Sequence, residues 1–314
     1  MECLYLVVPC YNEQEVLPET AKRLTAKLRS LVAGEKVTGD SRILFVDDGS
    51  KDKTWELIAG LHQLDGQIEG LKLAHNRGHQ NALLAGLMTA KERADIVISM
   101  DADLQDDIDA VDKMLEQRAA GCDIVYGVRS SRKTDTAFKR GTAQLFYRMM
   151  TFFGAEVVYN HADYRLMSRR ALEGLAQFGE VNLFLRGIVP MVGYPTGTVE
   201  YERGQRFAGE SKYPLSKMLN FALDGITSLS VKPIRFITLL GVAIFLCSLV
   251  MLAYSLVRWL SGATVVGWTS IVVSVWGIGG LQLLAIGIIG EYLGKIYLET
   301  KGRPRYIIEQ YLHE

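Results

Sequence analysis

The stretch Ile96-Val97-Ile98-Ser99-Met100-Asp101-Ala102-Asp103-Leu104-Gln105 decides how the N-terminal part of this chain folds. It opens with a short, mostly apolar run that lacks polar alternation, which is typical of a strand buried on both faces of a parallel sheet. Two carboxylates and an amide follow at once. In open α/β sheets, ligands bind beyond the carboxyl ends of the strands. The stretch therefore predicts a buried strand that carries Asp101 and Asp103 to a binding site.

Other short apolar runs flank this one and alternate with helical patterns. The runs that predict strands are 4–8, 43–46, 72–74, 96–100 and 124–126, and the segments with helical periodicity are 15–31, 54–64, 81–93 and 110–119. Strands that alternate with helices predict a layered α/β domain with a mainly parallel sheet, which we expect over residues 1–205.

Polar residues also follow the first two predicted strands. Residues 9–13 (PCYNE) end the first strand and residues 47–50 (DDGS) end the second, so three strand ends bring carboxylates or amides to one edge. The pair Asp101 and Asp103 can hold a hard divalent cation that binds a diphosphate. Neither GxxxxGK[ST] nor GxGxxG lies near a strand end, which argues against a P-loop or a dinucleotide site.

Composition limits the possible partners. The 314 residues are 49% hydrophobic and 22% charged, and 35 Lys and Arg residues balance 35 Asp and Glu residues. A zero net charge argues against a general nucleic-acid binder, which usually has a basic excess. The four cysteines have no CxxC spacing, which is typical of ordinary thiols in a reduced compartment. We expect no signal peptide, because the chain opens without a basic segment.

The apolar surplus is concentrated near the C-terminus. Uncharged stretches run over residues 236–257 and 260–290, and about 20 residues suffice to span a bilayer. They predict two transmembrane helices within 234–290, between a juxtamembrane region (206–233) and a tail (291–314). Basic residues flank this hairpin, and Arg258 alone lies in its turn, so we expect both termini to be cytoplasmic.

Four ordered motifs resemble the inverting GT-A glycosyltransferases of family 2. They are residues 7–13 (VVPCYNE), 46–52 (VDDGSKD), 75–80 (HNRGHQ) and 101–106 (DADLQD). Residues 162–167 (ADYRLM), 206–213 (RFAGESKY), 290–297 (GEYLGKIY) and 301–306 (KGRPRY) extend the resemblance to polyprenyl-phosphate glycosyltransferases. That group includes dolichyl-phosphate mannose synthase-like enzymes and the bacterial undecaprenyl-phosphate glucosyltransferase branch. The resemblance implies a GT-A domain, an interfacial helix and a transmembrane hairpin.

The resemblance also implies roles for single residues. Four residues are expected to line the nucleoside pocket: Pro9, Tyr11, Glu13 and Asp47. Asp101 is expected at the nucleotide, and Asp103 with Gln105 around the diphosphate and a Mg²⁺ or Mn²⁺ ion. The residues expected near the phosphates are Arg206, Ser211 and Lys212. Asp103 is the expected metal ligand. One departure is visible at Asp106-Asp107-Ile108, where many relatives have Asp-Pro-Pro.

The acceptor side carries a basic run at residues 128–140, which resembles the mobile acceptor loop of the family. Guanidinium groups bind phosphate with two hydrogen bonds, so Arg129 or Arg132 is expected at the lipid phosphate. A merely solvated charged face is the alternative. Residues 214–231 have an amphipathic helical pattern, which predicts a helix lying in the membrane interface or, alternatively, packed on the catalytic domain.

In the family that this sequence resembles, a general base is often proposed at the position of Asp163. A phosphate monoester has its second pKa near 6, so at pH 7 the attacking oxygen is already mostly ionised. A base accelerates a reaction only when there is a proton to remove. We therefore predict that Asp163 mainly orients the sugar or the acceptor and that electrostatic positioning dominates.

The resulting hypothesis is a metal-dependent, membrane-anchored inverting glycosyltransferase. It moves one hexose, with UDP-glucose favoured as donor, to a polyprenyl phosphate, most simply undecaprenyl phosphate, on the cytoplasmic leaflet of the inner (plasma) membrane. A processive polysaccharide synthase is one alternative, although residues 144–148 lack the QxxRW motif, and a non-enzymatic nucleotide-sugar-binding scaffold is another. Glycines of the second span, such as Gly290 and Gly294, predict helix contacts within the chain or in a homo-oligomer.

Overall fold

The computed structural model describes residues 1–130, 161–202, 204, 232–261 and 267–313. These residues form two units. Described residues up to 204, together with those from 303 onward, build an α/β unit, and those from 232 to 302 build a helical unit. Both ends of the chain therefore contribute to the α/β unit.

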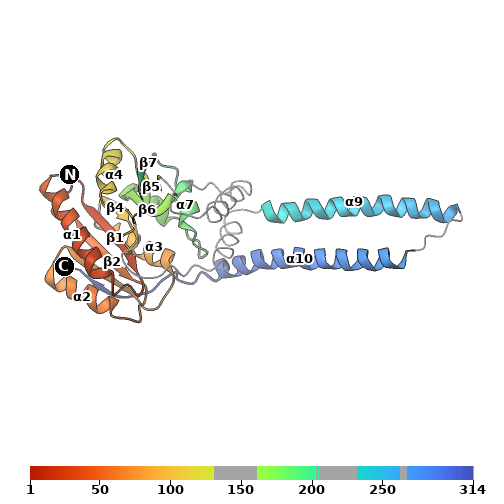
Figure 1. Ribbon diagram of the computed structural model, residues 1–314, viewed down its shortest axis with the longest axis horizontal. Coiled ribbons are helices and arrows are strands. Elements are labelled where there is room, and N and C mark those ends of the chain that lie inside the picture. The colour runs from red at the N-terminus through yellow and green to blue at the C-terminus, as the bar shows by residue number, and fades with distance from the viewer. Residues whose placement is uncertain (131–160, 203, 205–231, 262–266, 314) are drawn as a thin grey trace. The chain divides into compact units, whose positions relative to one another are not determined.

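The α/β unit is organised around an eight-stranded sheet (Figure 1). Its strands are β1 (Leu4–Cys10), β2 (Arg42–Asp47), β3 (Ile68–Leu73), β4 (Ile96–Ser99), β5 (Ile124–Arg129), β6 (His161–Ser168), β7 (Thr196–Tyr201) and β8 (Ile308–Leu312). The spatial order is β7-β5-β6-β4-β1-β2-β3-β8. Strands β3, β2, β1 and β4 are parallel, β6 runs antiparallel to β4 and β5, β7 is parallel to β5, and β8 is antiparallel to β3. The predicted α/β fold with a mainly parallel sheet is confirmed.

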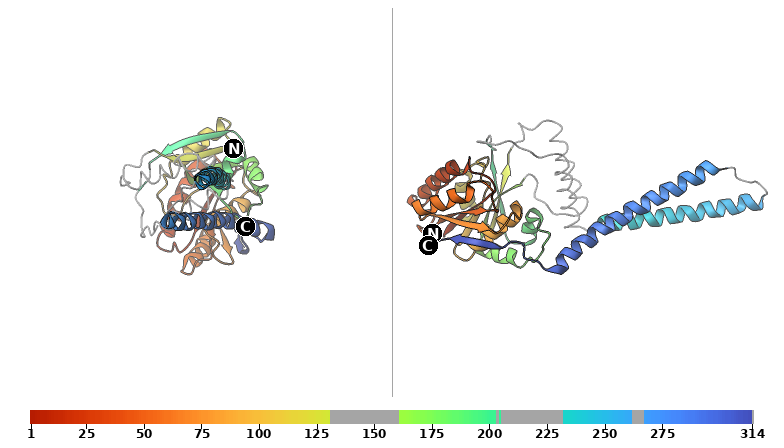
Figure 2. Two further views of the ribbon diagram at one scale, coloured as in Figure 1. Left: turned by 90° about the vertical axis from the view of Figure 1, so that its right-hand side faces the viewer. Right: turned by 90° about the horizontal axis from the view of Figure 1, so that it is seen from below.

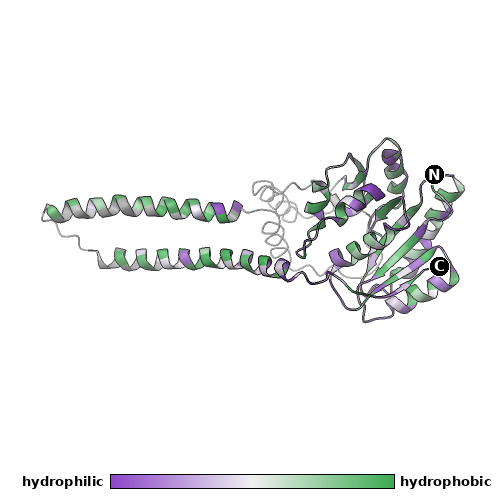
Figure 3. Cartoon of the chain, turned by 180° about the vertical axis from the view of Figure 1, so that it is seen from behind, coloured by the Kyte–Doolittle hydropathy of each residue, from purple (hydrophilic) through white to green (hydrophobic). Residues whose placement is uncertain are grey.

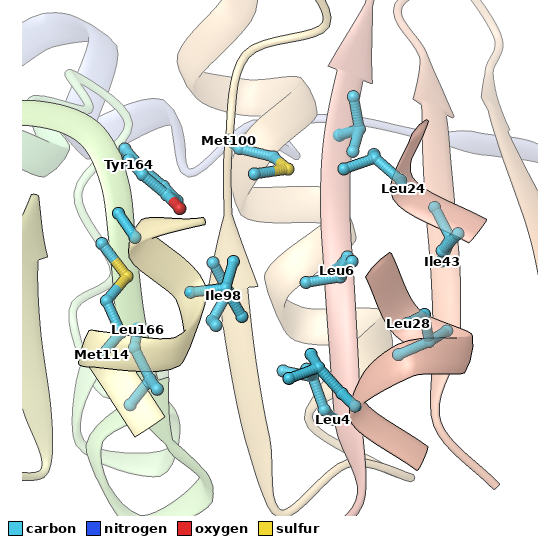
Figure 4. Packing of buried hydrophobic residues seen from close by; sticks show 14 of the residues in the cluster. Leu4, Leu6, Leu24, Leu28, Ile43, Ile98, Met100, Met114, Tyr164 and Leu166 are labelled. Atoms are coloured by element: carbon cyan, nitrogen blue, oxygen red, sulfur yellow. The ribbon is translucent and has the colours of Figure 1, made fainter. Parts of the chain in front are cut away.

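Helices cover both faces of the sheet (Figure 2). The first face packs against α1 (Leu17–Ala33), α2 (Thr54–Leu64) and α4 (Ala110–Ala119), and the second against α3 (His79–Ala90), α6 (Arg169–Ala176) and α7 (Leu185–Met191). Strand β1 is buried throughout because its side chains alternate between the two layers. Leu4 and Leu6 enter the first core, drawn in Figure 4, and Tyr5 and Val7 enter the second.

Several predicted boundaries were wrong. The third strand begins at Ile68 rather than residue 72, because residues 68–71 pair with β2 although Glu69 interrupts the apolar pattern. Helix α3 begins at His79 rather than residue 81, directly after Gly78, whose φ of 85° belongs to a turn. Strands β6, β7 and β8 were not predicted at all.

Strand β8 is held on the edge of β3 by a buried carboxylate. Glu69 is only 2% exposed and accepts hydrogen bonds from the Tyr311 hydroxyl at 2.7 Å and the Tyr5 hydroxyl at 3.2 Å. Burial, reinforced by the Glu69 charge, raises the pKa of Tyr5 to about 12. Both phenols therefore stay protonated as donors, and the strand covers a sheet edge that would otherwise expose unpaired backbone groups.

The helical unit consists of α9 (Lys232–Leu260) and α10 (Trp268–Lys301), which pack against each other. Hydrophobic colour extends along both helices in Figure 3, and large apolar side chains such as Leu239, Val250 and Leu283 are exposed. Among the described residues, one helical segment, Gly277–Lys301, is long and apolar enough to cross a membrane, and Ile234–Ile244 is a shorter apolar segment. The predicted pair of spans is thus matched by one candidate.

Candidate active site

The three polar strand ends meet as the sequence predicts. Strands β2, β1 and β4 are parallel neighbours in the sheet, with Cys10 paired to Asp47 and Val7 to Ser99. Their carboxyl ends therefore lie along one edge, and the Asp48 amide donates to the Cys10 carbonyl at 2.9 Å. This edge is the candidate site.

The predicted nucleoside residues lie at the ends of β1 and β2 and on the loop that follows β1. Hydrogen bonds join this loop to the segment after β2. The Asn12 amide donates to the Ser50 hydroxyl oxygen at 2.9 Å, and the Glu13 amide donates to the Thr54 hydroxyl oxygen at 2.9 Å. Asp47, at the end of β2, is fully buried, and burial raises its pKa. Tyr11 is exposed, whereas Pro9 is buried within β1. The buried carboxylate of Asp47 and the exposed ring of Tyr11 thus lie at neighbouring strand ends.

Asp48 organises the loop that leads to α3. Its two carboxylate oxygens accept the backbone amides of Arg77 at 2.7 Å and Gly78 at 2.9 Å. Gly49 has a φ of 65°, and a Cβ there would lie 2.7 Å from the Asn76 nitrogen, so no other residue fits. The close approach fixes where α3 begins and hence where its first residue, His79, projects.

The loop after β4 carries the predicted acidic pair. Asp103 is 9% exposed, and the Gln105 amide donates to its Oδ1 at 3.2 Å. Between these two residues, Leu104 has a φ of 57°, a strained conformation for a residue with a branched side chain. Burial raises the pKa of Asp101, and the carboxylates of Asp163 and Asp103 add to the effect, against the opposing effect of His79.

The side chains of this loop suit a divalent cation whose remaining ligands come from a bound substrate. Among the described residues, no three His, Cys, Asp or Glu side chains gather into a ready-made metal site. Mg²⁺ is usually held by one or two carboxylates together with substrate phosphates and water. Asp103 and Asp101 supply hard oxygen donors, and in the described part of the chain the buried Oδ2 of Asp106 has no hydrogen-bond partner. The donor set therefore suits Mg²⁺ or Mn²⁺ bound with a diphosphate.

Asp106, which precedes the departure from many relatives at Asp107 and Ile108, lies buried under the same loop. Its Oδ1 accepts the Tyr201 hydroxyl at 2.5 Å, and Arg129 lies alongside, with Nε 3.4 Å from the Tyr201 oxygen and Nη2 3.9 Å from Asp106. Burial, reinforced by Asp101, raises the pKa of Asp106 to about 6. Arg129, predicted at the acceptor phosphate, is thus partly engaged with the donor-side loop.

Asp163 reaches the site because β6 runs antiparallel to β4. The start of β6 therefore lies beside the end of β4, where the Ser99 hydroxyl donates to the Asp163 carbonyl at 2.5 Å. The Asp163 carboxylate accepts Arg165 Nη2 at 2.7 Å on Oδ1 and Arg186 Nη2 at 3.0 Å on Oδ2. Asp163 is consequently held between two guanidinium groups.

His79 links this carboxylate to the acidic loop. Its Nε2 lies 3.6 Å from Asp163 Oδ2 and 3.7 Å from Asp101 Oδ1. Burial opposes protonation of His79, but the two carboxylates outweigh it and raise its pKa. Burial also opposes ionisation of Asp163, yet Arg186, His79 and Arg165 hold its pKa well below 3.8. A carboxylate in this state is a weak proton acceptor near neutral pH.

Sequence reasoning missed part of this arrangement. Arg132, Arg206, Ser211 and Lys212, like the amphipathic segment 214–231, lie outside the described residues. The site residues that were not predicted are His79, Asp106, Arg165, Arg186 and Tyr201. His79 stands in a quoted motif, and Arg165 lies two positions from Asp163 on the same face of β6, so both carried a local signal. Arg186 carried none.

Comparison with known proteins shows which family this chain belongs to. The family model described as Glycosyl transferase family 2 matches residues 5–175, more than half of the chain. The chain belongs to glycosyl transferase family 2. It is therefore a glycosyltransferase, and its fold is the GT-A-like α/β fold.

Full-length relatives support the same assignment. "Uncharacterized glycosyltransferase YkoT" of Bacillus subtilis (strain 168) is 56% identical over 306 residues, which cover 98% of this chain and 91% of that protein. "Bactoprenol glucosyl transferase" of Shigella phage SfX is 40% identical over 306 residues, covering 97% of this chain and 98% of that protein. Relatives with this name support the predicted polyprenyl-phosphate glucosyltransferase branch.

Solved structures are more distant. A mycobacterial protein is similar with a TM-score of 0.50 and 16% identity, covering 73% of this chain and 74% of that one, which shows the fold alone. The mannosyltransferase PcManGT from Pyrobaculum calidifontis, in complex with GDP-Man and Mn2+, has a TM-score of 0.45 and 16% identity, and covers 95% of this chain and 85% of that one.

Proposed function

We propose that this glycosyltransferase moves a single glucose from UDP-glucose to a polyprenyl phosphate, most simply undecaprenyl phosphate, with inversion at the anomeric carbon. The observation that carries the proposal is the charge pattern of the sheet edge. Carboxylates end β2 and β4, whereas His79, Arg165 and Arg186 surround Asp163 at the start of β6. The full-length relatives named bactoprenol glucosyl transferase support the donor sugar and the acceptor.

The acidic side suits the donor. Asp47 and the loop after β1 would hold the nucleoside, and Asp101, Asp103 and Gln105 would surround the diphosphate, as would Arg206, Ser211 and Lys212. A Mg²⁺ or Mn²⁺ ion bound at Asp103 would neutralise the charge of the departing diphosphate. The ion would bind together with the donor, because the described residues gather no ready-made set of metal ligands.

The acceptor phosphate oxygen would attack the anomeric carbon in line with the leaving diphosphate. No proton has to be removed, because a phosphate monoester is mostly ionised at pH 7. Asp163, whose pKa is held well below 3.8, contributes as an organising carboxylate, and Arg129 and Arg132 are the basic-run residues proposed for the acceptor phosphate. Catalysis then comes from positioning and electrostatics.

Attachment to a membrane belongs to the same proposal. The acceptor is a lipid, and Gly277–Lys301 is long and apolar enough to span a bilayer. We infer that α9 and α10 anchor the enzyme as a two-span hairpin in the plasma membrane, with both termini in the cytoplasm and residues 206–233 as the juxtamembrane region. The basic residues on both flanks support this orientation.

The test uses the purified full-length protein in detergent. It is incubated with Mg²⁺ or Mn²⁺ and a panel of nucleotide sugars, with and without undecaprenyl phosphate, and lipid products are identified by mass spectrometry. We expect glucosyl phospholipid and stoichiometric UDP only when UDP-glucose, metal and lipid are all present. UDP release without lipid, or a growing polysaccharide, would refute the proposal.

Two variants of the β4 loop sharpen this assay. Asp103→Asn removes the proposed metal ligand and should abolish turnover at any metal concentration. Asp107→Asn is the matched control, because Asp107 is exposed in the same loop. Equal activity of the two variants would contradict the assignment of the acidic pair.

A further inference from the structure

The cluster around Asp163 presents different groups to solvent and to the interior. The side chains of His79 and Arg186 are 43% and 30% exposed, whereas those of Asp163 and Arg165 are 11% and 1% exposed. A ligand that approaches this part of the edge therefore meets the imidazole and the guanidinium before it meets the carboxylate.

The charge of the cluster favours an anion. Two guanidinium groups, on Arg165 and Arg186, face the carboxylate of Asp163, so these three groups carry one positive charge in excess. The carboxylate of Asp101, 3.7 Å from His79, offsets that excess unless His79 is protonated. A bare carboxylate would repel a phosphate. With its charge already compensated by two arginines, Asp163 no longer excludes a phosphate from this position.

The two exposed groups are built into one rigid arrangement. His79 and Gln80 are the first residues of α3, and Gln80 Oε1 accepts the Leu185 amide at 2.9 Å, at the start of α7. Arg186 is the next residue of α7, so one hydrogen bond ties the helix that carries the imidazole to the helix that carries the guanidinium. Each group then contacts Asp163, His79 at 3.6 Å and Arg186 at 3.0 Å.

We propose that Arg186, together with His79, binds the phosphate group of the acceptor, and that Asp163 is a positioning residue that holds these two donors in place. The inference rests on the function proposed above and adds a binding site to it. A guanidinium fork recognises phosphate oxygens by paired hydrogen bonds, and Arg186 is partly exposed at the edge where the acceptor oxygen must arrive.

The test is Arg186→Gln in the full-length enzyme. A charged hydrogen bond to phosphate accounts for about a ten- to hundredfold difference in affinity. We expect the KM for polyprenyl phosphate to rise by about that factor, while the Kd for UDP with Mn²⁺ changes less than about twofold. Arg186→Lys keeps the charge without the fork and should recover part of the loss.

Arg170→Gln is the matched control. Arg170 pairs with Asp123 at 2.6 Å, and Asp123 is likewise held by a second arginine, Arg118. Asp123 accepts the Ser168 hydroxyl, at the end of β6 opposite to Asp163. The kinetics of Arg170→Gln should equal those of the unaltered enzyme. Thermal unfolding of each variant shows which of them are folded, and Arg186→Lys alone carries the test if Arg186→Gln does not fold.

Three results would overturn the inference. Weaker UDP binding with an unchanged lipid KM would assign Arg186 to the donor diphosphate instead. Unchanged values of both constants would leave it no role in substrate binding, and an equal rise in lipid KM for Arg170→Gln would make the effect structural. Failure of the underlying function would instead be seen in the unaltered enzyme, as the absence of any glycolipid product.

Discussion

Replacing Asp163 with Asn separates a positioning carboxylate from a general base. The substitution removes the negative charge that faces Arg165, which is 1% exposed, and Arg186 at 3.0 Å. Breaking a buried ion pair costs about 3–5 kcal/mol. Because Asn retains one acceptor oxygen, we expect a loss near the lower limit, about 3 kcal/mol. For an α/β unit of this size, that corresponds to a fall in Tm of about 6–12 °C.

The pH dependence of this loss has a definite sign. The folded pKa of Asp163 lies well below 3.8, so its contribution to stability is fully present above 3.8 and is lost as the pH falls through the folded value. The part of the Tm difference between Asp163→Asn and the unaltered enzyme that comes from Asp163 itself should therefore be constant from pH 5 to pH 8. This part should shrink only in more acidic solution. The lost contact between Asp163 and protonated His79 adds a second part, which decreases as the pH rises through the raised pKa of His79.

The activity assay carries the decisive comparison. Misplacement of His79 and Arg186 should lower turnover by about a hundredfold, and the ratio to the unaltered enzyme should change between pH 6 and pH 9 only through the titration of His79, with no steep recovery. Asp123→Asn is the control, since Asp123 is also held by two arginines. It should lose stability but keep its turnover. If Asp163→Asn is inactive at pH 6 and recovers steeply as the pH rises, Asp163 is a base and our reasoning is wrong.

Three further predictions concern the scaffold and the acidic loop. Gly86→Ala should lower the free energy of unfolding by about 1–3 kcal/mol, because its Cβ would lie 2.5 Å from Val7 Cγ1; an unchanged Tm would contradict the packing of α3 on β1. Tyr311→Phe removes the hydroxyl that donates to buried Glu69 and should speed proteolysis of the C-terminal strand, unlike a change at exposed Gln310 of the same strand. Burial raises the pKa of Asp106 to about 6, so the folded state holds an extra proton between pH 3.8 and 6 and stability falls as the pH rises through that window. Without metal, the Asp106→Asn variant should not show this fall in stability. Its Tm should exceed that of the unaltered enzyme at pH 8 but not at pH 4. If the two Tm profiles run parallel between these pH values, the prediction is wrong.

The central strands could be predicted because burial on both faces leaves a plain apolar run. The same argument explains the strands that were missed. Strand β6 carries Asp163 and Arg165, two buried charges that interrupt the apolar pattern although they neutralise each other in the fold. Strands β7 and β8 lie at the two edges of the sheet, where exposed polar residues are tolerated.

Some site residues could likewise be predicted from the local sequence, whereas others are brought to the site only by tertiary contacts. Asp47, Asp101 and Asp103 follow strands directly, so their meeting at one edge follows from parallel pairing alone. Arg186 contacts Asp163 only because α7 is tied to Gln80 and because β6 enters antiparallel. Neither condition can be derived from residue spacing.

In the proposed function, the antiparallel direction of β6 also explains how one sheet edge would accept two anions. A fully parallel sheet would bring only the residues that follow each strand to this edge, and in this chain those residues are mainly acids that suit a cation and a diphosphate. Reversing one strand brings the beginning of β6 there instead, with Asp163 and Arg165, and Arg186 of α7 adds the second guanidinium group. His79 lies between the two groups of charges, 3.7 Å from Asp101 of the loop after β4 and 3.6 Å from Asp163, which Arg165 and Arg186 contact. In the proposed reaction, the sugar passes from a metal-bound diphosphate at the loop after β4 to an acceptor phosphate at Asp163 and its arginines. The charge pattern of the edge therefore places the donor and the acceptor on opposite sides of His79.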